Sequence, residues 1–167
     1  MLEANTILSI INAIGISSII AHIIISCVSS RREFDRIKRA IIMELTINLD
    51  LLQEIKRKAE GHIYPMPLLK DVAWNILLAS PQLAKFGGDR PDDPIILLSN
   101  IYTIISVLNQ MIRDRNLLPF SMLRATNIYT ETLETFDKSI EENTAKLIRS
   151  IERALNILKG FKMKGIY

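Results

Sequence analysis

The feature that most constrains this chain is a long uncharged segment at its beginning. No Asp, Glu, Lys or Arg occurs from Ala4 to Ser30, and isoleucine dominates residues 6–28. A helix that rises 1.5 Å per residue needs about 20 apolar residues to cross the roughly 30 Å hydrocarbon core of a bilayer. The sequence therefore predicts a transmembrane anchor over residues 1–30 and a separate domain over residues 31–167.

The charges beside this segment predict its orientation. The residues before it include Glu3 but no Lys or Arg, unlike the basic start of a secretory signal peptide. Residues 31–39 contain five basic and two acidic residues. By the positive-inside rule we expect a single-pass protein of the cell membrane, with its N-terminus outside and its C-terminal domain in the cytoplasm. The alternative is an apolar helix that is buried by protein, in a soluble assembly, a filament or a virion.

Small residues recur at every fourth position of the apolar segment, at Ser9, Ala13, Ser17 and Ala21. This small-xxx-small spacing lets two membrane helices approach closely. One interpretation is a packing face for a second copy of the chain or for a partner membrane protein. The other is chance recurrence in a segment rich in serine and alanine, and the sequence leaves both open.

Composition limits what residues 31–167 can form. The segment is long enough for one domain with a core of its own. The whole chain is 49% apolar and 23% charged with a net charge of +3, which is close to ordinary globular usage. Cys27 is the single cysteine, so no disulfide can form within one chain.

Apolar residues at helical spacing predict an all-α fold. The first stripe continues from the anchor without a break, ends at Gly61, and consists of Phe34, Ile37, Ile41, Leu45, Asn48, Leu52, Ile55 and Ala59. A connector over residues 63–67 follows, and Pro67 is expected to open a third helix that continues through Leu77. Asp93 should cap a fourth helix that begins at Pro94 and continues to about Asn116.

The last helix is expected from about Ser121 to Leu158. Its apolar positions keep a heptad-like step, with Asn143 and Thr144 as the weak point: Tyr129, Leu133, Phe136, Ile140, Leu147, Ile151, Ala154 and Leu158. A period near 3.5 predicts coiled-coil packing along another long helix. We expect this helix to lie antiparallel to the one over residues 34–60, within a four-helix antiparallel bundle.

The sequence contains no pattern that indicates a catalytic, cofactor-binding or metal-binding residue. The two histidines, His22 and His62, have no nucleophile within sequence reach, and no Cys/His group has zinc spacing. The aspartates of residues 89–93 lack the rest of a calcium-loop pattern. No basic face with interleaved aromatic residues indicates binding to nucleic acid. The sequence therefore predicts a protein that is not an enzyme.

Two asparagines lie in line with apolar residues that should face the core. Asn48 interrupts the first stripe, and Asn109 follows Leu108 in the fourth helix. A buried amide left without hydrogen bonds costs about 1–3 kcal/mol. We predict a shared buried polar cluster of Asn48, Asn109 and Tyr102. The alternative is that each amide lies at the edge of its stripe and meets water.

One resemblance rests on the segment Glu44-Leu-Thr-Ile-Asn48-Leu, the proline-containing connector, the helix that carries Trp74, and the spacing of Tyr102 and Asn109. With these features the chain resembles uncharacterised prokaryotic proteins in which a single-pass membrane anchor precedes a helical bundle. The resemblance covers roughly residues 1–115. It implies a fold and a membrane location, and it carries no activity.

Basic residues gather at the two ends that an antiparallel return would bring together. They are Arg31, Arg32, Arg36, Lys38, Arg39, Lys159, Lys162 and Lys164. We expect them to face the anionic inner leaflet of the bilayer. The predicted function is a membrane-anchored, non-enzymatic helical scaffold or interaction module that binds a second copy or a partner membrane protein. The alternative function is a structural subunit of a larger membrane assembly or virion.

Overall fold

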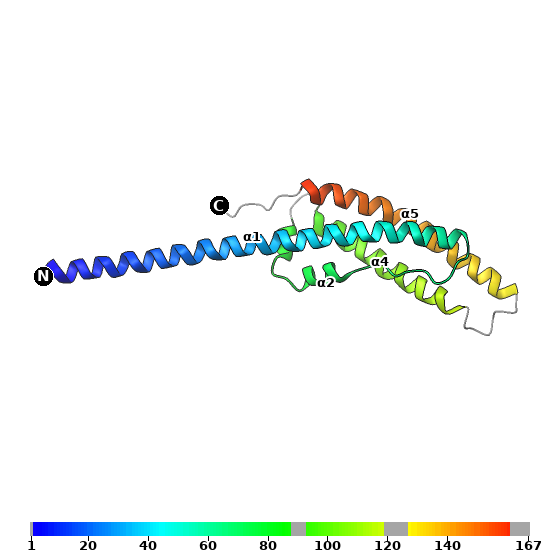
Figure 1. Cartoon of the computed structure of the whole chain (residues 1–167), viewed down its shortest axis with the longest axis horizontal. Helices are drawn as coiled ribbons and strands as arrows, with labels where there is room; N and C mark the ends of the chain where they lie inside the picture. Colours follow the sequence, from blue (N-terminus) through cyan, green and yellow to red (C-terminus); the bar gives the residue numbers. More distant parts are fainter. Residues whose placement is uncertain (1, 88–92, 119–126, 161–167) are drawn as a thin grey trace. The chain divides into compact units, whose positions relative to one another are not determined.

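The computed structural model describes residues 2–87, 93–118 and 127–160, and their side chains from residue 22 onward except at 127–129. These residues form helices and no strands, which confirms the all-α prediction (Figure 1). The helices are α1 (Leu2–Glu60), α2 (Val72–Leu78), α3 (Leu83–Phe86), α4 (Pro94–Leu117) and α5 (Asn127–Gly160).

Helix α1 is uninterrupted, but it contributes to two compact units of the chain, Met1–Arg36 and Ile37–Tyr167. In the first unit, the side chains of residues 22–29 are all exposed. Among them are Ile23, Ile24, Ile25 and Val28, with exposed fractions of 53%, 57%, 67% and 45%. This part of α1 therefore exposes a broad apolar face, with His22, Ser26 and Ser29 on the remaining side of the helix.

In the second unit, α1 buries the stripe that its periodicity predicts. The buried residues recur every three or four positions and are Ile37, Ile41, Leu45, Asn48, Leu52, Ile55 and Ala59. Steps of three and four residues keep side chains on one face of a helix, so this stripe forms one wall of the core. The exposed side of the helix carries charged residues such as Asp50 and Arg57.

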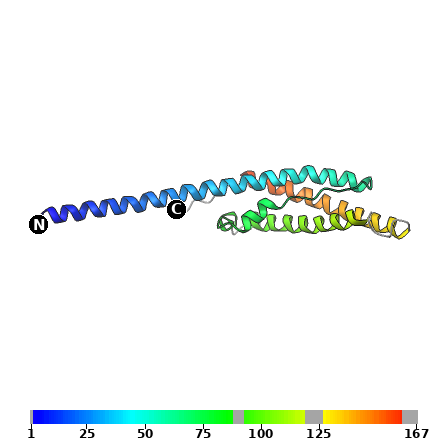
Figure 2. The ribbon, with the colours of Figure 1, turned by 60° about the horizontal axis from the view of Figure 1, so that its bottom comes forward.

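Helix α5 packs against α4, and both views of the chain show it running antiparallel to α4 and to the 37–60 part of α1 (Figures 1 and 2). The buried row of α5 has the heptad steps of four and three residues: Leu133, Asp137, Ile140, Thr144, Leu147, Ile151, Ala154 and Leu158. The prediction that Phe136 occupies this row is wrong. Asp137 takes the position, because its carboxylate has a buried cationic partner on α4.

Helix α4 begins as predicted. The Asp93 carboxylate accepts a hydrogen bond from the Ile95 N–H at 2.8 Å, and Pro94 occupies the first turn, where a missing N–H costs nothing. Among the residues with described side chains, α4 is long and apolar enough to cross a membrane. Its buried side packs in the core, and its exposed side carries the polar residues Ser99, Thr103, Ser106, Gln110 and Arg113 together with Ile96 and Val107.

The segment after α1 differs from the prediction. Residues 63–71 contain no helix, and α2 begins at Val72, so the prediction that Pro67 opens a helix is wrong. We call residues 61–71, which join α1 to α2, the connector. Side chains of α1 and α4 form hydrogen bonds with its backbone. Those bonds replace the intrahelical bonds that a helix would supply.

Candidate functional site

Three asparagine side chains hold the backbone of the connector. Each side-chain amide donates to the backbone C=O of one connector residue and accepts a hydrogen bond from the N–H of the same residue. The pairs are Asn48 with Lys70 at 2.8 and 2.7 Å, Asn109 with Leu69 at 3.0 and 2.8 Å, and Asn116 with Met66 at 3.0 and 3.0 Å.

Two helices supply the asparagines that bind the connector. Asn48 lies on α1, and Asn109 and Asn116 lie on α4. Asn48 and Asn109 are buried, and they bind the adjacent residues Lys70 and Leu69. A buried backbone polar group without a partner is costly, and an amide satisfies a donor and an acceptor together. The two amides therefore act on one short stretch of backbone.

A second cluster lies where the connector enters α2. The Glu44 carboxylate accepts hydrogen bonds from the Ala73 N–H at 2.8 Å and from the Tyr102 hydroxyl at 2.7 Å. Asp71, which precedes α2, forms no side-chain cap bond. The N-terminus of α2 is therefore capped from another helix, by a carboxylate whose charge suits the positive end of the helix dipole.

Tyr102 joins this cluster to the only tryptophan. Its ring stacks on that of Trp74, with centroids 5.0 Å apart and planes inclined by 6°. Burial raises the pKa of the Tyr102 hydroxyl far above its ordinary value, and the hydrogen bond and negative charge of Glu44 add to the effect. Tyr102 is thus bonded to Glu44, while the amides of Asn48 and Asn109 bind the connector.

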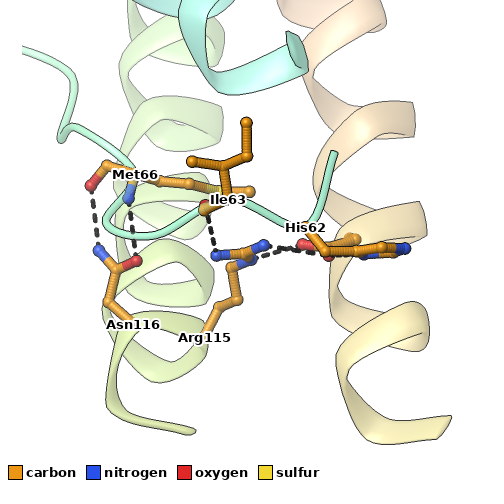
Figure 3. A network of polar contacts seen from close by, with 6 residues as sticks. His62, Ile63, Met66, Arg115 and Asn116 are labelled. Atoms are coloured by element: carbon orange, nitrogen blue, oxygen red, sulfur yellow. Dashed lines mark hydrogen bonds and ion pairs between the residues drawn. The ribbon is translucent and has the colours of Figure 1, made fainter. Parts of the chain in front are cut away.

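The third cluster lies at the start of the connector (Figure 3). The fully buried Arg115 of α4 donates from Nε to Asp137 Oδ1 at 2.5 Å and from Nη2 to Asp137 Oδ2 at 3.1 Å. Its Nη1 donates to the Ile63 C=O at 3.0 Å, and its guanidinium carbon lies 3.9 Å from the centroid of the Tyr64 ring. Such bidentate pairing suits the planar guanidinium fork and compensates for burial of both charges.

His62 completes this cluster from a backbone conformation that is unusual for its residue type. Its φ is 51°, in the left-handed region that normally favours glycine or asparagine. The N–H groups of His62 and Ile63 donate to the Ala59 and Lys58 carbonyls, which closes α1 with a Schellman motif. The His62 Nδ1 lies 2.7 Å from Asp137 Oδ2, while half of the side chain remains exposed.

The other predicted site residues fall in different parts of the chain. Ser9, Ala13, Ser17 and Ala21 lie on α1, and their side chains are outside the described residues. The basic residues Arg31, Arg32, Arg36, Arg39 and Lys159 are exposed, and Lys38 is half-buried. Lys162 and Lys164 lie outside the described residues.

Sequence reasoning missed five residues of these polar clusters: Glu44, His62, Arg115, Asn116 and Asp137. One signal could have found two of them. Continuing the heptad steps of α5 from Leu133 places Asp137 in the core row, and continuing those of α4 from Ile112 places Arg115 there. Opposite charges in the core rows of two long helices indicate a buried ion pair.

The asparagines and Glu44 bind backbone groups, and Arg115 binds both the Ile63 carbonyl and Asp137. Asparagine amides are not titratable, and Arg115 and Asp137 neutralise one another. Among the described residues, no three His, Cys, Asp or Glu side chains lie together in a way that could hold a metal ion. Comparison with protein-family models, curated proteins and solved structures found no match.

Proposed function

We propose that this chain is a membrane-anchored, non-enzymatic helical module, which acts by binding a second copy of itself or a partner membrane protein. The observation that carries the proposal is the exposure of Ile23, Ile24, Ile25 and Val28 on α1, next to an uncharged segment long enough to cross a bilayer. Burying one such side chain contributes about 1.5–3 kcal/mol, so a surface of this kind is expected to be covered. Lipid is the covering that fits an apolar segment of this length.

The charge pattern supports an orientation for the anchor. Arg31, Arg32 and Arg36 are exposed immediately after the apolar residues. Because basic residues beside a membrane helix favour the cytoplasmic side, we propose that residues 31–167 lie in the cytoplasm and the N-terminus lies outside. Protease added to intact cells should then leave residues 51–167 uncut, and cleavage there would contradict this orientation.

The use of polar groups inside the second unit supports an interaction role. Asn48, Asn109 and Glu44 are bonded to the connector or to α2, and Arg115 is bonded to Asp137. Titratable groups that serve catalysis usually lie together in a cleft with perturbed pKa values. Here the buried polar groups stabilise a fold whose surfaces are then available for a partner.

The rival proposal is that protein, rather than lipid, covers the apolar part of α1, as in a larger membrane assembly or a virion. The two proposals differ in how the chain leaves a membrane fraction. A single lipid anchor resists alkaline carbonate, requires detergent and then gives small particles. A subunit of an assembly instead sediments as a large particle in mild detergent.

A matched pair of variants sharpens the test. Ile16→Lys places a charge near the middle of the proposed anchor, where a lysine at mid-membrane depth costs about 2.5–3.5 kcal/mol, so the carbonate-resistant fraction should fall. Ile96→Lys makes the same change at an exposed site on α4, where Ile96 is 60% exposed, and it should leave that fraction unchanged. Equal extraction of both variants and of the unmodified chain would argue against a lipid anchor at this segment.

A further inference from the structure

We infer that the first unit carries a binding site for the headgroups of anionic phospholipids, formed by Arg31, Arg32 and Arg36 of α1. All three side chains are exposed, and all belong to the unit Met1–Arg36. The inference rests on the proposed function, because it requires that the apolar part of α1 lie in lipid. It adds the class of lipid that the chain selects.

The spacing along α1 places two of these arginines at headgroup depth and the third just beyond it. Val28 is the last large apolar residue of the exposed segment. At 1.5 Å per residue, Arg31 and Arg32 lie about 5–6 Å beyond it and Arg36 about 12 Å beyond it. The headgroup layer extends about 5–8 Å beyond the hydrocarbon core on each side of a bilayer. With Val28 at the edge of the core, two arginines lie within the layer and the third lies just outside it.

The residue type fits a phosphate ligand. The planar guanidinium presents paired N–H donors that match two phosphate oxygens, whereas a lysine offers a single point charge. Arg32 and Arg36 are four residues apart and so lie on the same side of the helix, whereas Arg31 points to another side. The site is therefore suited to more than one lipid around the helix.

Acidic residues near the arginines could repel anionic headgroups, but the order of charges along the helix places the arginines closer to the bilayer. Arg31 and Arg32 come first after the apolar segment, and Glu33 and Asp35 follow. Both acidic residues therefore lie farther from the apolar segment than the first two arginines. A basic residue close to an anionic surface contributes about 1 kcal/mol, which corresponds to roughly a fivefold preference for each arginine.

The test uses the full chain reconstituted in vesicles of phosphatidylcholine with phosphatidylglycerol as the minor component. The protein is extracted together with its surrounding lipid by an amphipathic copolymer, and the retained lipids are quantified by mass spectrometry. We expect phosphatidylglycerol to be enriched severalfold over the vesicle composition. In the variant Arg31→Gln, Arg32→Gln, Arg36→Gln, we expect the retained lipid to match the vesicle composition.

The matched control is Arg57→Gln, Arg113→Gln, Arg149→Gln, which removes the same charge from three exposed arginines of the second unit. This control should keep the enrichment. Two results would overturn the headgroup site: equal enrichment in both triple variants, or no enrichment in the unmodified chain that has entered the vesicles. Failure of the unmodified chain to enter the vesicles at all would instead refute the anchor, so the two proposals fail in different ways.

Discussion

The carboxylate of Asp137 accepts two hydrogen bonds from the guanidinium of Arg115, and both side chains are buried where α4 packs against α5. The same carboxylate also binds His62, and the same guanidinium also binds the Ile63 carbonyl. One ion pair thus joins two long helices to the start of the connector.

Breaking this ion pair on one side should destabilise the fold strongly. Asp137→Asn keeps the side-chain shape but leaves the buried Arg115 without its counter-charge, which costs about 3–5 kcal/mol. The unfolding temperature, followed by circular dichroism of the full chain in detergent, should fall markedly. Arg115→Met combined with Asp137→Leu removes both charges and should recover most of the loss. A double variant as unstable as the single one would refute the view that the unpaired charge causes the loss.

The connector should depend jointly on Asn48 and Asn109. Asn109→Leu leaves a buried N–H and a buried C=O of Leu69 without partners, at about 1–3 kcal/mol for each group. Asn48→Leu does the same to the part-buried groups of Lys70 and should cost less. Because the amides bind adjacent residues, we expect the double variant to lose less stability than the sum of the single variants. Denaturant unfolding of all four proteins measures this coupling. Strict additivity would mean that the two amides act independently.

The backbone at His62 should favour glycine over alanine. Both substitutions remove the contact with Asp137, but alanine keeps a Cβ in the left-handed region, where the penalty is about 1–2 kcal/mol. His62→Gly should therefore be more stable than His62→Ala by roughly 1 kcal/mol, or slightly less after the entropy of glycine in the unfolded chain. Thermal unfolding of the two variants side by side tests this order, and a more stable alanine variant would contradict it.

Tyr102 should make the fold sensitive to alkali. The unfolded chain releases the tyrosine proton near its ordinary pKa of 10.0, while the folded chain retains it because its pKa is raised. The unfolded state then binds fewer protons, so stability is fully present below pH 10 and falls as the pH rises above it, by up to about 1.4 kcal/mol per pH unit. Denaturant unfolding at stepped pH should show this decline, and Tyr102→Phe should decline less over the same range.

The small residues of the anchor give a prediction about association. If Ser9, Ala13, Ser17 and Ala21 form a packing face, Ala13→Leu or Ser17→Leu should weaken self-association, because a larger side chain keeps two helices apart. Ile→Leu at Ile14 conserves volume and serves as the control. A two-hybrid assay within the membrane compares the three variants. Equal association would favour chance recurrence of small residues.

The parts of the fold that the sequence predicts well are those with a strong period. The stripe from Ile37 to Ala59 and the cap at Asp93 follow from local spacing and residue type. The prediction of a helix after Pro67 was wrong because this segment is held by contacts that are distant in the sequence. Its backbone bonds to Asn48 and Asn109, which lie 22 and 40 positions away from their partners in the sequence. No local sequence pattern can predict a hydrogen bond between residues so far apart in the chain.

The clusters around the connector show the same limit in the choice of residues. Preferring apolar residues for the core selected Phe136 over Asp137, although strict heptad spacing points to Asp137. No nucleophile lies near His62 in the sequence, and no local pattern indicates its structural role. Its position depends on the end of α1 and on a carboxylate of α5, which only the assembled fold brings together.

The three asparagine pairs recognise main chain and not side chains, and this decides which connector residues are free to vary. The N–H groups they require belong to Met66, Leu69 and Lys70. Pro65 and Pro67 flank the first of these, at positions whose missing N–H is not part of any asparagine pair. The hydrogen bonds themselves therefore set no preference for a side chain, although the buried Met66 and Leu69 still require apolar ones. Proline is excluded at these three positions, because each must donate its N–H, but it is accommodated at positions 65 and 67.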